Sequence, residues 1–232
     1  MIKALLLGSI GVVSETSEIQ RQSYNAAFRE VGLAWDWDAE TYKELLVAVG
    51  GKERLSLLSR ATTGQLDAET IDTIHTRKTE IACDRVLKEK PPLRHGVAPL
   101  LRYTKKHGLK SGFVTSTYRP NIDAIINAHT DVFDHYPFDV VISKTDVAAG
   151  KPAPDCYVEA LRQLDLEPSE VVAVEDTAAS AVAASRAGLK VIATPGAFAA
   201  GQDFFMADLV VPALGNDTRV ADDVMAFLAA MR

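Results

Sequence analysis

Short apolar runs alternate along this chain with longer segments in which apolar residues recur at every third or fourth position. The short runs predict strands at residues 2–7, 111–114, 138–142, 171–174, 190–193 and 209–211. Helical spacing is found at residues 97–106, 121–129, 154–164, 178–187 and 219–231. Because strands and helices alternate in this way, we expect an α/β fold with a doubly wound, mostly parallel sheet.

The segment that follows the first predicted strand has a helical pattern throughout. Apolar residues recur at helical spacing in residues 17–31, 41–49, 52–61 and 67–90, with Asp38 placed to cap the second of these helices. A proline pair at 91–92 ends the last helix, because proline cannot continue it. We therefore expect an all-helical cap, residues 16–92, inserted into an α/β core made of residues 1–15 and 93–232.

Composition and charge narrow the class of protein. Hydrophobic residues make up 47% and charged residues 24% of the 232 positions, which is typical of a globular protein with a substantial core. A net charge of −6 without runs of lysine or arginine argues against nucleic acid and anionic membrane surfaces as partners. No apolar stretch approaches the roughly 18 residues needed to span a bilayer, so we expect a cytoplasmic protein. Cys83 and Cys156 stand alone, which indicates packed thiols rather than a zinc or redox site.

Polar residues follow several predicted strands, where ligands bind in open α/β sheets. The loop of residues 8–11, after the first strand, contains no carboxylate, histidine or cysteine. Thr115 and Ser116 follow strand 111–114, and their hydroxyls either hold phosphate oxygens beside a helix N-terminus or form a simple turn.

A lysine and two adjacent acids are the other candidates for chemistry. Lys151 lies between Gly150 and a segment stiffened by two prolines. A solvated surface lysine gains nothing from a fixed backbone, whereas a lysine that meets a phosphate or carboxylate does. Glu175 and Asp176 follow strand 171–174 and repel each other unless a cation lies between them. The alternative is that these acids only cap the next helix.

Taken together, the motifs resemble those of the haloacid dehalogenase superfamily, and within it the CbbY-like and β-phosphoglucomutase-like branch with a helical cap. Thr115 matches the second motif of that family, Lys151 the third, and Glu175 with Asp176 the fourth. Further CbbY-like stretches are found at residues 35–38, 42–46, 50–54 and 92–94. The resemblance covers essentially the whole chain. It implies chemistry on phosphorylated sugars, with Mg²⁺ held by Glu175 and Asp176.

The first motif of the family is where this chain departs from the pattern. Members carry Asp-x-Asp-Gly, in which the first aspartate is the nucleophile that forms an aspartyl-phosphate and the second is the general acid/base. Gly8 and Ile10 stand at these positions, while Gly11 keeps the register. We expect Ser9 to be a poor substitute, because strand alternation directs its side chain to the other side of the strand. Since glycine supplies no nucleophile, we expect a rate loss on the order of 10⁴ to 10⁶.

The same departure affects the metal ion and the lysine. Mg²⁺ loses a carboxylate ligand at Gly8, although the backbone carbonyl of Ile10 is still available as a donor, so we expect weak or absent Mg²⁺ binding. In the family the lysine pairs with the nucleophile. Here we expect Lys151 to pair with Glu175 or Asp176 instead.

Three interpretations of function remain open. In the first, the chain binds a phosphorylated sugar or another anion without turnover, with contacts from Thr16, Lys52, Thr115, Ser116 and Lys151. In the second, it is a working hydrolase that uses a metal-bound water at Glu175 and Asp176. In the third, it is a structural or regulatory partner of another protein.

Restoring both aspartates, with Gly8→Asp and Ile10→Asp, is expected to produce activity if the rest of the pocket is intact.

Overall fold

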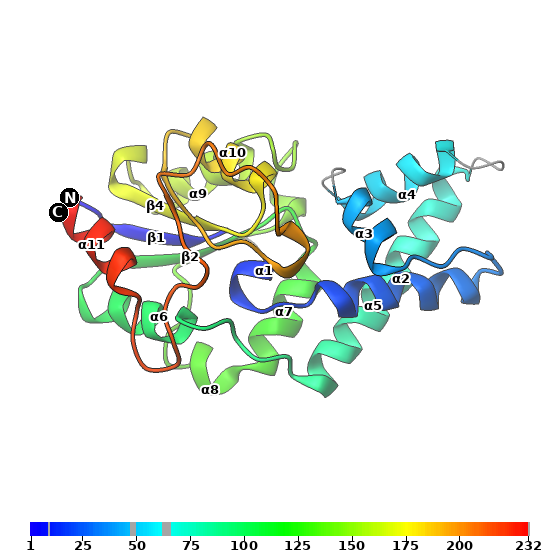
Figure 1. Ribbon diagram of the computed structural model, residues 1–232, viewed down its shortest axis with the longest axis horizontal. Coiled ribbons are helices and arrows are strands. Elements are labelled where there is room, and N and C mark those ends of the chain that lie inside the picture. Colours follow the sequence, from blue (N-terminus) through cyan, green and yellow to red (C-terminus); the bar gives the residue numbers. More distant parts are fainter. Residues whose placement is uncertain (9, 47–49, 62–65, 232) are drawn as a thin grey trace.

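A parallel sheet forms the centre of the molecule in the computed structural model, which describes residues 1–8, 10–46, 50–61 and 66–231 (Figure 1). Within these residues the sheet has six strands in the order β3-β2-β1-β4-β5-β6, and every pairing between them is parallel. The strands are β1 (Ala4–Leu7), β2 (Lys110–Val114), β3 (Val140–Ile142), β4 (Val171–Glu175), β5 (Lys190–Ala193) and β6 (Leu209–Val210). The predicted α/β fold is confirmed.

Helices cover both faces of this sheet, so alternate residues of each strand enter different clusters. Leu5 and Leu7 of β1 pack in the cluster that includes side chains of α6 (Val97–Lys106), α7 (Arg119–Ala128) and α11 (Asp222–Ala230). Ala4 and Leu6 face the opposite side, where α9 (Asp155–Leu164) and α10 (Ala178–Arg186) lie.

No helix in the described part of the chain is both long enough and apolar enough to span a bilayer.

Several element boundaries differ from those predicted, and one difference affects the site. The loop expected at residues 8–11 is shorter than predicted, because the short helix α1 (Ile10–Val13) begins at Ile10. Another short helix, α8 (Thr130–Phe133), was not predicted. The strand expected at 171–174 includes Glu175 as well, so this carboxylate belongs to the sheet and not to the loop after it. The strand extends to Glu175 because its backbone carbonyl accepts a hydrogen bond from the Thr194 amide at 2.7 Å.

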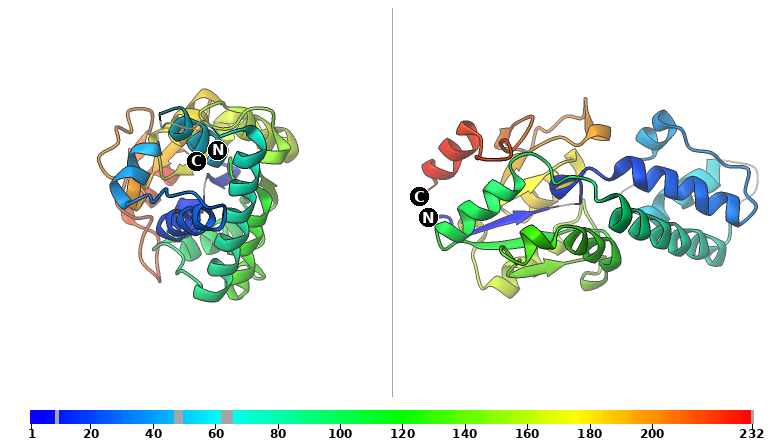
Figure 2. Two further views of the ribbon diagram at one scale, coloured as in Figure 1. Left: turned by 90° about the vertical axis from the view of Figure 1, so that its right-hand side faces the viewer. Right: turned by 90° about the horizontal axis from the view of Figure 1, so that it is seen from below.

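The remaining helices form a separate group beyond the carboxyl end of β1, as Figures 1 and 2 show. They are α2 (Ser17–Glu30), α3 (Ala39–Leu45), α4 (Gly51–Ala61) and α5 (Ala68–Glu89). Their own core is aromatic, with rings of Tyr24, Phe28, Trp37 and Tyr42 in contact. Asp38 caps α3 as predicted, since its side chain accepts from the Thr41 amide at 2.8 Å. Residues 47–49 of the predicted second helix lie outside the described residues. This group is the proposed cap.

Two connections join the proposed cap to the sheet, and hydrogen bonds tie them together. The Ser14 hydroxyl donates to the carbonyls of Pro91 and Pro92 at 3.1 and 3.0 Å. Ser14 and Leu93 form an antiparallel bridge, and the Arg94 amide donates to the carbonyl of Val13 at 2.9 Å. The outgoing and returning segments therefore form a short two-stranded ribbon.

Arg94 fixes the returning segment to the core. Its guanidinium donates to the carbonyls of Gly11 at 2.9 Å and Pro195 at 3.0 Å. It also donates to the carbonyl of Thr194 at 2.8 Å and to the hydroxyl of that residue at 3.0 Å. A single side chain thus holds together the loops that follow β1 and β5, both at the same edge of the sheet.

Candidate functional site

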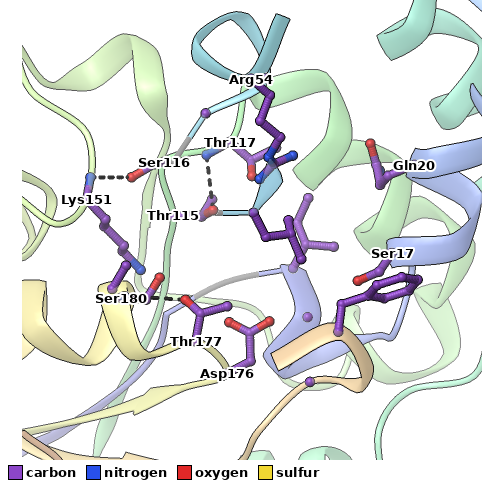
Figure 3. Close-up of a pocket in the computed structure, with 18 of the residues that line it drawn as sticks. Ser17, Gln20, Arg54, Thr115, Ser116, Thr117, Lys151, Asp176, Thr177 and Ser180 are labelled. Carbon is purple, nitrogen blue, oxygen red and sulfur yellow. Dashed lines mark hydrogen bonds between the residues drawn. The ribbon is translucent and has the colours of Figure 1, made fainter. Parts of the chain in front are cut away.

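A pocket of about 600 Å³ lies at the carboxyl end of the sheet, between the sheet and the proposed cap (Figure 3). From β1 the chain continues to β2 and β3 on one side, whereas β4, β5 and β6 extend on the other side. The boundary between β1 and β4 is therefore the topological switch point, where ligands bind in open α/β sheets. Gly8 after β1, Thr115 after β2 and Asp176 after β4 all line the pocket.

Most of the residues predicted from sequence line this pocket. They are Thr16, Thr115, Ser116, Lys151 and Asp176, together with Gly8 and Ile10 at the positions of the missing aspartates. The Ser116 hydroxyl accepts from the Lys151 amide at 2.7 Å, and that of Thr115 accepts from the Thr117 amide at 3.1 Å (Figure 3). These bonds fix the loop after β2 against the lysine segment.

Lys52 and Glu175, in contrast, are not among the lining residues. The ammonium of Lys52 points to the Asp72 carboxylate at 2.7 Å and is about a third exposed. Glu175 is fully buried, with its side chain directed beneath the pocket and not into it. The position of Glu175 follows from its place in β4, because successive strand residues point to opposite faces and this one shares the face of Ala173.

Glu175 forms a buried cluster with Lys151 and Tyr157. The ammonium of Lys151 lies 2.6 Å from Glu175 Oε1, which also accepts from the Tyr157 hydroxyl. Lys151 further donates to the backbone carbonyl of Gly8 and to that of Val114 at 2.9 Å. The lysine thus pairs with Glu175, one of the two acids we expected. Burial raises the pKa of the Glu175 carboxyl to about 7, an effect that the charge of Lys151 opposes.

This cluster occupies the volume that a side chain at residue 8 would need. Leu7 pairs with Val174, so Gly8 stands next to Glu175 on the neighbouring strand, with its missing side chain on the same face. A Cβ atom at Gly8 would lie closer than 3.0 Å to the Glu175 carboxyl group and to the Tyr157 hydroxyl. Sequence analysis missed Tyr157. It could have been found from its position, because it lies six residues after Lys151 on the buried face of the predicted helix.

Gly8→Ala is expected to lower the free energy of unfolding by about 1–3 kcal/mol, because one methyl group overpacks the space beside Glu175 and Tyr157. Urea unfolding measures the change. Gly150→Ala is the comparison variant and is expected to lose less stability, since its added Cβ would lie 3.3 Å from the Ser116 hydroxyl, a tight contact without the overlap found at Gly8. Equal stability of Gly8→Ala and the natural protein would show that the cluster moves aside freely.

The proposed cap contributes cations that sequence analysis did not identify. Arg54 reaches the pocket from α4 (Figure 3), and Lys78 lines it from α5, donating to the Gln20 side-chain carbonyl. Burial lowers the pKa of Lys78 to about 7, and the charge of Arg54 adds to this effect. The signal for Lys78 was its spacing, because it follows Ile71 and Ile74 on the apolar face of its helix.

The backbone donor expected at Ile10 is engaged elsewhere. Its carbonyl accepts from the Ser14 amide at 2.8 Å, because Ile10 begins helix α1. One lone pair of this carbonyl is therefore used inside the helix, and the other lone pair stays a possible donor to a metal ion. Among the described residues, no group of three or more histidine, cysteine, aspartate and glutamate side chains comes together as a metal site.

A parallel six-stranded sheet with helices on both faces and a pocket at its switch point is the fold of haloacid dehalogenase-like hydrolases. The chain belongs to this family, whose model matches residues 5–188. It is CbbY-like within the family. Protein CbbY of Cereibacter sphaeroides is 37% identical over 211 residues, which cover 90% of this chain and 90% of that protein.

Solved structures agree with this assignment. A mutant CbbY from Rhodobacter sphaeroides, crystallised in complex with xylulose-(1,5)bisphosphate, superposes with a TM-score of 0.86 at 36% identity. The match covers 92% of this chain and 95% of that chain. The β-phosphoglucomutase of Clostridium difficile shares the fold, with a TM-score of 0.75 at 17% identity over 100% of both chains.

Proposed function

We propose that this protein binds a phosphorylated sugar in the pocket and does not form an aspartyl-phosphate. The observation that carries the proposal is the floor of the pocket at Gly8. No nucleophile is present there, and the Glu175 carboxyl group and the Tyr157 hydroxyl fill the space that one would occupy. Because Glu175 is fully buried, it offers no replacement nucleophile to a ligand in the pocket.

The rest of the pocket supports binding of a phosphorylated ligand. Thr16, Thr115 and Ser116 line it with hydroxyl-bearing side chains, and Arg54 and Lys78 line it from α4 and α5. Arginine and lysine recognise phosphate through charge and hydrogen bonding, and hydroxyls add neutral donors. The CbbY structure in complex with xylulose-(1,5)bisphosphate supports a sugar bisphosphate as the ligand class.

Thermal unfolding with and without ligand tests the proposal. Sugar bisphosphates at about one hundred times their Kd are expected to raise the Tm by about 5–10 °C, since they bind the folded state alone. Unphosphorylated sugars at the same concentrations are the control. Lys78→Met is expected to reduce the shift, whereas Lys106→Met, at an exposed position outside the pocket lining, leaves it unchanged. A flat Tm across phosphorylated sugars would contradict the proposal.

A further inference from the structure

The family resemblance implies Mg²⁺ at this site, and the donor set tests whether the ion fits. Mg²⁺ requires near-octahedral oxygen ligands, some from protein and the others from water and phosphate. Gly8 has no side chain to offer, and the carbonyl of Ile10 accepts from the Ser14 amide inside helix α1. Of these two positions, the first therefore provides no ligand, and the second provides only a carbonyl oxygen that already accepts one hydrogen bond.

Glu175 is directed away from the pocket as well. Its Oε1 atom accepts hydrogen bonds from Lys151 and Tyr157, and its Oε2 atom is buried without a hydrogen-bond partner among the described residues. Turning the carboxylate toward the pocket would leave the ammonium of Lys151 buried without its counter-ion, which is costly. Of the carboxylates that the family uses, Asp176 alone lines the pocket. One carboxylate and one shared carbonyl oxygen are a poor donor set for Mg²⁺, with two carboxylates fewer than the family motifs supply.

Other groups supply positive charge and hydrogen-bond donors. Helices α7 and α10 both begin at the pocket wall, so the positive ends of their dipoles point toward it. Besides Lys151, the ionisable lysines, arginines and carboxylates of the lining are the basic residues Arg54, Lys78 and Lys144 and the acidic residues Glu53, Asp176 and Asp203. Asp176 lies on the core side of the pocket near Thr177, across from Arg54 (Figure 3).

We infer that the pocket binds the phosphoryl group of its ligand without a divalent cation, and that the Asp176 carboxylate opposes this binding. The inference rests on the phosphosugar binding proposed above. In a magnesium-dependent site the aspartate assists the anion through the ion. In a site without a metal ion, the same carboxylate repels the anion directly, because like charges at short range raise the free energy of the complex.

The sign of the effect of Asp176→Asn distinguishes the two cases. Isothermal titration with inorganic phosphate and with glucose 1-phosphate is carried out in EDTA and again in excess Mg²⁺. Without a metal ion in the site, Kd is expected to be equal in both buffers, and Asp176→Asn is expected to tighten binding about tenfold in each. Asp134→Asn makes the same charge change at an exposed position outside the pocket lining and is expected to leave Kd unchanged.

Each other outcome overturns a defined statement. Binding that requires Mg²⁺ and is lost in Asp176→Asn would overturn the metal-free site and leave phosphosugar binding intact. An unchanged Kd in Asp176→Asn would overturn the opposing role of that carboxylate. Absence of binding in both buffers, for both ligands and for a sugar bisphosphate, would overturn the proposed function and this inference with it.

Discussion

Purified protein is expected to release phosphate from sugar phosphates at least about 10⁴-fold more slowly than relatives that keep both first-motif aspartates. Covalent phosphoryl transfer needs a nucleophile at the carboxyl end of β1, and Gly8 has none. Ile10, at the position of the acid/base, packs into the core cluster on one face of the sheet. Phosphate release from a panel of sugar phosphates and p-nitrophenyl phosphate, with Mg²⁺ present, measures the rate.

Asp176→Asn, purified in the same way, is the control for contaminating host phosphatases. Equal residual release by both proteins would identify it as contamination. Release by the natural protein that disappears in Asp176→Asn would contradict the expectation and favour a metal-bound water as the nucleophile.

Restoring the two aspartates is not expected to restore turnover, and here the structure revises the expectation from sequence. An aspartate at residue 8 would overlap Glu175 and Tyr157. One at residue 10, which lies between the core cluster and the pocket, would lose the apolar contacts of Ile10. The Gly8→Asp, Ile10→Asp double variant is therefore expected to be less stable and still inactive. Turnover by a folded double variant would show that the buried cluster rearranges around a new carboxylate.

Lys151→Met is expected to lower the free energy of unfolding by about 3–5 kcal/mol, because it leaves the Glu175 carboxylate buried without its cation. The loss is expected to depend on pH. Burial raises the pKa of Glu175 to about 7 from an ordinary value of 4.5, so the folded state holds a proton that the unfolded state has released between these values. The contribution of Glu175 to the free energy of unfolding is thus fully present below pH 4.5 and is lost as pH rises through 7.

Removing Lys151 raises the pKa of Glu175 further, so the destabilisation is expected to be smaller at pH 5 than at pH 8. Urea unfolding at both pH values measures it. Adding Glu175→Gln to Lys151→Met is expected to recover part of the loss, since the buried charge is then absent. Lys106→Met, at an exposed position, is expected to change stability by less than about 0.5 kcal/mol. Full stability of Lys151→Met at pH 8 would show that the pair is not ionised.

Much of the fold could be predicted from the sequence, because hydrophobic spacing reports directly on burial. The strands at β2, β4 and β5 and the long helix α5 lie within one or two residues of their predicted bounds. Short elements were less accessible. The single-turn helices α1 and α8 contain too few residues to show a period, and only contacts with the rest of the chain stabilise them.

The site could be located from sequence but not assembled. The order of motifs places Thr115, Lys151 and Asp176 at one edge of the sheet, and these residues line the pocket. The side chain of Glu175 points away from the pocket because β4 continues for one residue beyond the apolar run. The pattern of apolar residues does not show this extension of the strand. That Arg54 and Lys78, and not Lys52, line the cap side depends in turn on how α4 and α5 rotate against the core.

The hydrogen-bonded ribbon formed by the two connections restricts how the helical part can move. Two independent tethers would allow it to swing and twist in many directions. Ser14 donates hydrogen bonds to Pro91 and Pro92 and pairs with Leu93, so we expect the two connections to bend together as one hinge. Arg94 fixes the core end of that hinge to the loops after β1 and β5. We therefore expect any opening of the pocket to be a rotation about one axis that runs through these two connections.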